Sequence, residues 1–419
     1  MSTTSDAAGT QPPATALGHL RVLDLSRVLA GPWCGQILAD LGAHVIKIER
    51  PGEGDDTRHW GPPFMKDADG RDTDHATYYT CANRNKQSVT VDITQAEGQA
   101  IVRELALKSD VLIENFKAGG LARYGLDYAT LKALNPRLIY CSITGFGHDG
   151  PYAPRAGYDL LIQASSGMMS ITGRPDGEPG GGPVRVGVAV TDLFTGVYAS
   201  TAILAALEVR HRTGRGQHID MALLDVGMTM LANQASAFLN TGRAPQRQGN
   251  SHPSIVPYQD FPTADGAMLL AVGNDGQFAR FCGAAGVPAW SRDERFATNT
   301  QRVRHRGLLI PMIEDLTRQR STAAWVELLE HRAVPCGPIN DIGQAFDDPQ
   351  VQARGLRVDL PHEHFGTIAG VASPLRLSDT PPVARNAPPD LGQHTDEVLA
   401  RVLNYDADRI AALRQQGVV

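Results

Sequence analysis

Asp192 is the residue whose type and position point most directly to chemistry. It lies in the run VAVTDLFTG (residues 188–196), after a Gly-rich segment (residues 177–187) and before an apolar helical pattern that ends at TGRG (residues 213–216). We expect a helix to begin near Thr191 or Asp192, where free N–H groups and the helix dipole favour an ionised carboxylate. Such a carboxylate can act as a nucleophile. Helix capping is the common structural alternative.

Cations and one aromatic residue follow several expected strands. Arg50, Lys86 and Arg123 lie just after a strand or near a Gly-containing turn, where Arg and Lys can hold phosphates. Asn115 and Phe116 end another strand. An amide beside a flat ring suits a polar ligand with an aromatic base. The structural alternatives are solvated surface charges and a turn with one core aromatic.

Alternating strands and helices position these residues. Short apolar strands are expected at residues 20–25, 44–48, 88–93, 110–113, 137–143 and 217–221, with helices at 33–41, about 94–108, 191–213 and 223–239. A capping box, TQAE at residues 94–97, opens the second of these helices. This alternation predicts an open, mostly parallel α/β sheet.

The pattern changes after residue 240. Residues 241–332 read as a linker and a small α+β domain, with a hairpin at 258–261 and 267–272 and helices at 277–283 and 302–318. Residues 333–419 begin Pro-rich and irregular and contain a helix at 395–403. Residues 1–17 are expected to be a disordered tail, since they lack the pattern of a signal peptide.

Composition excludes several classes of function. The net charge of −6 argues against a nucleic-acid partner. Five cysteines without a CxxC motif fit a reducing compartment, and without HExxH we predict no metal. We expect no apolar run that approaches the roughly 20 residues of a membrane span. These features predict a cytoplasmic protein without a membrane partner.

Several stretches together resemble one family, the class III CoA-transferases, which includes formyl-CoA transferase, carnitine CoA-transferase and α-methylacyl-CoA racemase. The resemblance covers nearly everything from about Leu20 to Val419. It is carried by LDLSRVLAGPWCGQILADLGAHVIKIERPGEGD, NRNKQSVTVD, DVLIENFKAGGLARYGL, NPRLIYCSITGFGHDGPYAPRAGYD, VAVTDLFTG, HRTGRGQHIDMALLD, VPCGPIND and LGQHTDEVL.

The resemblance implies both an architecture and a reaction. It implies a Rossmann-like large domain built from residues 18–240 and 333–419, a small α+β domain, and an interlocked homodimer. Asp192 matches the nucleophile of the family's transferases, which attacks an acyl-CoA thioester and passes through a mixed anhydride and an aspartyl-CoA thioester. Coenzyme A and acyl-CoA are then substrates, with small carboxylic acids as partners, and no tightly bound cofactor is expected.

Further residues carry over from the family by position. Asp159 is a supporting residue of the site, and Gly249 and Asn250 match a loop that closes over the intermediates. Leu29 stands where formyl-CoA transferase has Gln, which argues against formate or oxalate. The residues that match CoA contacts are Leu29, Ala30, Arg50, Val91, Asp92, Ile93, Thr94, Asn115, Phe116, Lys117 and Arg123.

The acids and the reaction class leave alternatives. The stretches ERPGEGDDTRHWGPPF, GNSHPSIVPYQDF and AVGNDGQFARFC look most like the branch that acts on succinyl-CoA and glutarate or hydroxymethylglutarate, so we expect succinyl-CoA as donor and a four- to six-carbon dicarboxylate as acceptor. Malate, citramalate and itaconate stay open. The candidates for binding a distal carboxylate are Arg27, Arg155, Arg247 and His252.

Two other functions remain open beside the transferase. The family's racemases use a His in a GHD stretch, and Tyr158 replaces that His here. A phenol is a poor base at neutral pH, which favours the transferase. A non-catalytic acyl-CoA binding protein is the third possibility, and the presence of Asp192 argues against it.

Overall fold

The structure, a computed structural model, describes residues 15–67 and 69–419, which form two compact units. The larger unit contains the described residues up to Ser166, with Val186–Ala232 and Gln352–Val419, and the smaller contains Gly167–Arg185 and Asn233–Val351. The units therefore change at 232/233 and 351/352 rather than at the expected 240/241 and 332/333. Residues 167–185, expected in the large domain, belong to the smaller unit.

The start of the folded chain also differs from the expectation. Leu17 was expected in a disordered tail, but it is buried and its N–H donates to the carbonyl of Leu41. Residues 1–14 lie outside the described part of the chain, and the expectation for them stays a prediction.

A six-stranded parallel sheet forms the centre of the larger unit, as the alternation of elements predicted. Its order is β5-β2-β1-β6-β7-β8, which is the doubly wound Rossmann order 3-2-1-4-5-6. The order reverses between β1 and β6, and ligands of such sheets bind beyond the carboxyl ends of the strands at that point. The strands are β1 (Arg21–Asp24), β2 (His44–Glu49), β5 (Lys86–Thr90), β6 (Val111–Glu114), β7 (Ile139–Thr144) and β8 (His218–Ala222).

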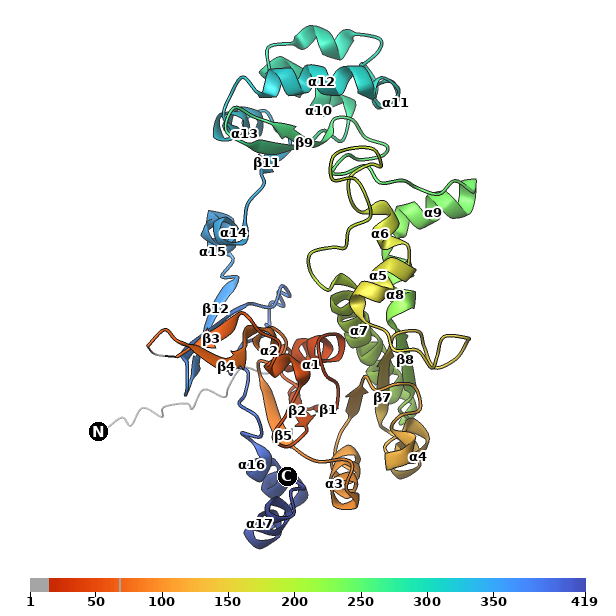
Figure 1. Ribbon diagram of the computed structural model, residues 1–419, viewed down its shortest axis with the longest axis vertical. Coiled ribbons are helices and arrows are strands. Elements are labelled where there is room, and N and C mark those ends of the chain that lie inside the picture. The colour runs from red at the N-terminus through yellow and green to blue at the C-terminus, as the bar shows by residue number, and fades with distance from the viewer. Residues whose placement is uncertain (1–14, 68) are drawn as a thin grey trace, which may run out of the picture. The chain divides into compact units, whose positions relative to one another are not determined.

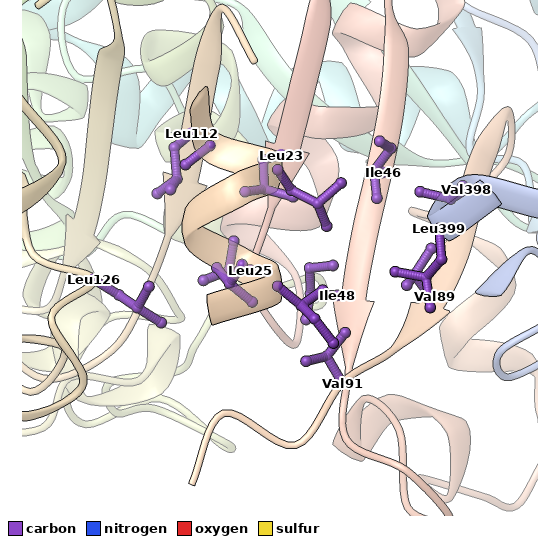
Figure 2. Packing of buried hydrophobic residues seen from close by; sticks show 14 of the residues in the cluster. Leu23, Leu25, Ile46, Ile48, Val89, Val91, Leu112, Leu126, Val398 and Leu399 are labelled. Atoms are coloured by element: carbon purple, nitrogen blue, oxygen red, sulfur yellow. The ribbon is translucent and has the colours of Figure 1, made fainter. Parts of the chain in front are cut away.

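Helices cover both faces of this sheet, because successive strand residues alternate between two apolar clusters. On one face, Val22 and Val45 pack with α1 (Ala30–Asp40) and α7 (Val190–Thr213). On the other, Leu23 and Ile46 belong to a cluster that includes residues near the C-terminus, and Figure 2 shows Ile46 and Val89 near Val398 and Leu399. The helices of this second face are α3 (Ala96–Leu107), α4 (Tyr128–Leu134), α16 (Thr395–Leu403) and α17 (Ala407–Gln415).

Several helices differ from their predicted bounds. Helix α1 begins at Ala30, because Gly31 and Pro32 form its first turn rather than a separate loop. The predicted capping box is wrong: Gln95 is the N-cap of α3 without a side-chain bond, and the Thr94 hydroxyl donates to Asp92 instead. The single helices expected at 223–239 and 302–318 are each broken, into α8 (Leu223–Met230) and α9 (Ala232–Thr241), and α11 (Asn299–Arg304) and α12 (Arg306–Thr317).

Helix α7 carries Asp192 and packs along α1 (Figure 1). It ends at Thr213 before Gly214, which has a φ of 73°, as predicted. A Cβ on Gly196 would lie 2.7 Å from the Ala30 carbonyl oxygen, so glycine allows the two helices to approach. In the described part of the chain, α7 alone is long and apolar enough to cross a membrane, contrary to the expectation that no run approaches this length. Its buried apolar residues Ala199, Ile203, Ala206 and Leu207 belong to the hydrophobic core on one face of the sheet.

The smaller unit has its own core around an antiparallel sheet of order β11-β10-β9. The predicted hairpin is confirmed as β9 (Tyr258–Pro262) and β10 (Ala267–Ala271), with β11 (Cys336–Pro338) beside β10. Its main helices are α10 (Asp275–Ala284), α12 and α13 (Thr322–Glu330).

The remaining elements of the described chain, from both units, are η1 (Asp56–Arg58), β3 (Phe64–Lys66), β4 (Asp72–Ala76), α2 (Thr77–Thr80), η2 (Ala122–Tyr124), α5 (Asp159–Ser165), α6 (Met168–Ile171), η3 (Pro288–Arg292), α14 (Ile342–Asp347), α15 (Pro349–Ala353), β12 (Arg357–His362) and β13 (Gly366–Val371).

Candidate active site

Asp192 lines a cavity of about 480 Å³ in the larger unit, which we call the Asp192 cavity. It is the third residue of α7, in the first helical turn. Other walls come from the turns after β1 and β6, including Leu29 and Asn115. The cavity therefore lies where the strand order of the sheet reverses, as expected for a ligand site in this topology.

The charge state of Asp192 differs from the sequence-based expectation. Burial and, after it, the neighbouring carboxylate of Asp159 raise the pKa of Asp192 to about 7. Among the described residues, no Lys or Arg forms an ion pair with it. One N–H of the first helical turn, that of Thr191, donates to Asp159 rather than to Asp192. Near neutral pH the carboxylate is thus present in both forms, and its ionised form is poorly solvated and reactive.

Asp159 is buried directly beside the nucleophile candidate. One of its oxygens accepts from the Thr191 backbone N–H at 2.9 Å and from the Thr191 hydroxyl at 2.7 Å. Its other oxygen accepts from Gln163, whose own carbonyl oxygen accepts from the Val186 N–H at the end of the Gly-rich segment. Asp159 therefore joins the start of α7 to the segment before it, which supports the positioning role proposed for it.

The turn after β1 is held by a buried ion pair. Lys47 and Asp55 are fully buried, with Nζ and Oδ2 2.8 Å apart. Burial opposes ionisation of Asp55, but the charge of Lys47 and its hydrogen bond outweigh that effect and lower the pKa of Asp55 to about 2. The Asp55 oxygens accept the Val28 N–H at 3.2 Å, and Lys47 donates to the Ser26 carbonyl. Val28 has a φ of 70°, a left-handed conformation that is unfavourable for a β-branched residue.

Asn115 has a structural contact that its sequence position did not suggest. Its amide oxygen accepts the Arg27 N–H at 2.9 Å, and its amide nitrogen donates to the Arg27 carbonyl at 2.7 Å. The side chain thus joins the two turns at the centre of the sheet. Each amide atom keeps a second hydrogen-bonding position, so the expected role of Asn115 in binding a ligand stays a prediction.

A second cavity of about 490 Å³, the Arg50 cavity, adjoins the first. Both cavities are lined by Arg27, Asp56, Phe116 and Arg123, so they adjoin at these residues. All of the predicted CoA contacts line one or both of these cavities. The Asp192 cavity contains Leu29, Ala30, Asn115, Phe116, Lys117 and Arg123, and the Arg50 cavity contains Arg50, Val91, Asp92, Ile93, Thr94, Phe116 and Arg123.

Three sequence-based candidates line neither of these cavities. Lys86 is fully buried and paired with Asp24 at 2.9 Å, because β5 carries it beneath the turn after β1 rather than towards a ligand. Gly249 and Asn250 belong to the smaller unit, where they line a separate hollow with Arg174 and Arg306. The Gly249 N–H donates to the Gly173 carbonyl there.

The four candidates for a distal carboxylate site separate into two pairs. Arg27 and Arg155 line the Asp192 cavity. Arg247 and His252 belong to the smaller unit. Arg247 forms an ion pair with Asp176 there.

Two features of the structure were not predicted from the sequence. Tyr78 lies in α2, and burial, then Cys81, then the Asp192 and Asp159 carboxylates raise the pKa of Tyr78 to about 12. Tyr78 therefore remains a neutral hydrogen-bond donor near the nucleophile candidate. No local motif marks Tyr78, because its approach to the site depends on tertiary packing.

The second overlooked feature is a His-x-His spacing at His362 and His364, beside Asp390. The His364 ring nitrogen Nδ1 lies 2.7 Å from Asp390, and the His362 ring accepts the His364 N–H. The spacing was visible in the sequence. These contacts describe a hydrogen-bonded cluster, and the prediction that the protein needs no metal stays a prediction.

Comparison with known proteins points to one family. The model of CoA-transferase family III matches residues 17–395. The chain is 53% identical to succinate–glutarate CoA-transferase of Agrobacterium fabrum over 95% of this chain and 98% of that one. It is 43% identical to human succinyl-CoA:glutarate CoA-transferase over 96% of this chain and 90% of that one. A crystal structure of a CaiB/BaiF family protein from Brucella suis matches with a TM-score of 0.82 and 48% identity, covering 93% of this chain and 99% of that one.

Proposed function

The chain belongs to CoA-transferase family III, and from that premise we propose that it transfers CoA from succinyl-CoA to a four- to six-carbon dicarboxylate such as glutarate or hydroxymethylglutarate. The observation that carries the proposal is Asp192, a carboxylate with a pKa of about 7 in a cavity at the reversal of strand order. Relatives of 53% and 43% identity that are named for succinate or succinyl-CoA and glutarate support the choice of acids.

Asp192 is the proposed nucleophile. Its ionised carboxylate attacks the thioester carbonyl of succinyl-CoA, which forms a mixed anhydride and releases the CoA thiolate. The thiolate then attacks the Asp192 carbonyl, so that succinate leaves and an aspartyl-CoA thioester remains. The acceptor carboxylate attacks this thioester and regenerates the thiolate, which attacks the acceptor carbonyl and frees Asp192.

CoA is proposed to extend across both cavities. Its thioester end reaches Asp192, and the remainder passes Phe116 and Arg123 into the Arg50 cavity. This path is supported by the residues that the two cavities share. Arg50 and Arg123 are the cations along it that are suited to phosphate groups. No tightly bound cofactor or metal takes part in the proposed reaction.

A homodimer is part of the proposal. Helix α7 leaves a stripe of large apolar side chains exposed in the larger unit: Phe194, Val197, Tyr198 and Leu204. Their spacing places them on one helix face, and soluble proteins rarely leave such a contiguous face uncovered. A second copy of the chain is the proposed cover, in a cytoplasmic enzyme that binds neither nucleic acid nor membrane.

A mixture experiment tests the function. The purified protein is incubated with succinyl-CoA and pooled glutarate, hydroxymethylglutarate, malate, itaconate, citramalate, oxalate and carnitine in heavy water, and new acyl-CoA masses are recorded. We expect glutaryl-CoA or hydroxymethylglutaryl-CoA. Transfer to carnitine or oxalate alone contradicts the choice of acids. Deuterium at the α-carbon of an added 2-methylacyl-CoA, without transfer, favours the racemase.

A further inference from the structure

Four cations line the Asp192 cavity, and they fall into two groups. Arg27 and Arg123 also line the Arg50 cavity, and Lys117 follows Phe116, another shared residue. These three lie on the side proposed for CoA. Arg155 lines the Asp192 cavity without lining the Arg50 cavity, in the same segment as Tyr158. Of the four cations, Arg155 is the one whose segment, residues 155–158, contributes to the Asp192 cavity but not to the Arg50 cavity.

Arg155 also differs from Arg27 in its contacts. Arg27 forms an ion pair with Asp56 at 3.3 Å. Among the described residues, no carboxylate forms an ion pair with Arg155. Its guanidinium lies 3.8 Å from the centre of the Tyr152 ring, which in turn makes an edge contact with Phe146. Stacking on a ring leaves the N–H edge of a guanidinium available for a bidentate bond to a carboxylate.

The segment that carries Arg155 has a fixed route to the nucleophile. A Cβ on Gly157 would lie 2.3 Å from the Cα of Gly145, so the segment passes directly against the chain after β7. Asp159 follows, and its carboxylate holds the N–H and hydroxyl of Thr191, the residue before Asp192. The position of the Arg155 backbone relative to Asp192 is therefore set by close packing and by two hydrogen bonds.

We infer that Arg155 binds the distal carboxylate of the acid whose other carboxylate reacts at Asp192, an inference that rests on the proposed transferase function. With CoA leaving Asp192 towards the Arg50 cavity, the acyl chain extends the opposite way, to Arg155. A dicarboxylate satisfies this guanidinium. A monocarboxylate of the same length places a methyl group beside the Arg155 guanidinium. The methyl group displaces water without replacing the hydrogen bonds that the water made, so binding of the monocarboxylate is disfavoured.

Competition between two acceptors tests the inference. The full-length protein is incubated with succinyl-CoA and equimolar glutarate and pentanoate, which have the same number of carbons, and the initial ratio of glutaryl-CoA to pentanoyl-CoA is measured by mass spectrometry. Both acceptors draw on one aspartyl-CoA intermediate, so any effect of a variant on the donor cancels. We expect Arg155→Gln to lower the ratio by about 10- to 100-fold, the range for losing charged hydrogen bonds. Arg155→Lys, which keeps the charge, should lower it less.

Arg212→Gln is the matched control, since Arg212 is an exposed residue at the end of α7; we expect it to leave the ratio unchanged. An unchanged ratio of glutaryl-CoA to pentanoyl-CoA in Arg155→Gln overturns the inference. A ratio that falls in Arg27→Gln but not in Arg155→Gln overturns it as well, because Arg27 would then bind the distal carboxylate. Both results leave the transferase proposal standing. Absence of any new acyl-CoA from the wild-type protein, in contrast, contradicts the transferase proposal itself.

Discussion

The carboxylate of Asp159 holds both the backbone N–H and the hydroxyl of Thr191, at 2.9 and 2.7 Å. This arrangement gives Asp159 two effects on Asp192, the residue that follows Thr191. It fixes the first turn of α7, and its negative charge adds to burial in raising the pKa of Asp192 to about 7. A positioning group thus also influences the protonation of the nucleophile.

Replacing Asp192 with Asn should abolish turnover, because an amide cannot form the anhydride or the thioester. We expect a loss of at least ~10³-fold in kcat, as for deletion of a covalent nucleophile. Asp225→Asn is the matched control, since Asp225 is an exposed Asp in the first turn of α8. The account fails if the Asp192 variant keeps its turnover in a coupled assay of succinyl-CoA consumption.

The pH dependence of the reaction should follow Asp192. Only the ionised form attacks, so kcat/KM for succinyl-CoA should rise with pH through about 7 and then level off. Asp159→Asn removes the neighbouring negative charge and should move this midpoint to lower pH by roughly half a unit to one unit. A purely structural Asp159 would change the rate and leave the midpoint in place.

The raised pKa of Asp192 also predicts that its ionised carboxylate destabilises the folded protein. An unfolded Asp titrates near 3.8 and folded Asp192 near 7, so the folded state binds more protons between these values. Stability from this group is present below about pH 4 and falls as pH rises to about 7. Asp192→Asn should therefore be more stable than wild type by roughly 1–3 kcal/mol at about pH 8, after allowance for partial exposure.

Denaturant unfolding at both pH values tests this prediction. The two proteins should differ in midpoint at about pH 8 and converge near pH 4. A wild-type protein that is more stable than the variant at about pH 8 would show that Asp192 is not held in an unfavourable environment.

The Lys47–Asp55 pair should be essential for the turn after β1. Lys47→Met leaves the Asp55 carboxylate buried without its partner, and breaking such a pair costs about 3–5 kcal/mol. The exposed pair Arg401–Glu397 is the control, and Arg401→Met should cost less than about 0.5 kcal/mol. Equal losses in urea unfolding would show that the buried pair does not stabilise the fold.

Much of the fold was predictable from the sequence because apolar strands and helices alternate regularly. The six strands of the parallel sheet were located to within a few residues, and the end of α7 followed from Gly214. The short strands β3, β4, β11, β12 and β13 were not predicted. Errors arose where local signals competed with packing. The capping box at 94–97 did not form because the Thr94 hydroxyl donates a hydrogen bond to Asp92. The N–H of Leu17 donates to the carbonyl of Leu41, and local sequence does not indicate a contact between residues so far apart in the chain.

The candidate site was predictable in its residues more than in their chemistry. Asp192 and the candidate CoA contacts, which the family resemblance implied, all line two adjoining cavities. The raised pKa of Asp192 was not predictable, since it depends on burial and on Asp159, which lies in a different helix. Likewise, only the contacts show that Asn115 bonds to Arg27 and that Lys86 is buried with Asp24.

The most direct test of the central claim follows an oxygen atom. When the acceptor carboxylate attacks aspartyl-CoA and the thiolate then attacks the acceptor carbonyl, one acceptor oxygen remains on Asp192. The protein is therefore incubated with succinyl-CoA and glutarate labelled with oxygen-18, digested, and analysed by peptide mass spectrometry, with a sample lacking succinyl-CoA as control. The account predicts oxygen-18 in the Asp192 carboxylate only when succinyl-CoA is present. Glutaryl-CoA formation with no label at Asp192 would contradict it.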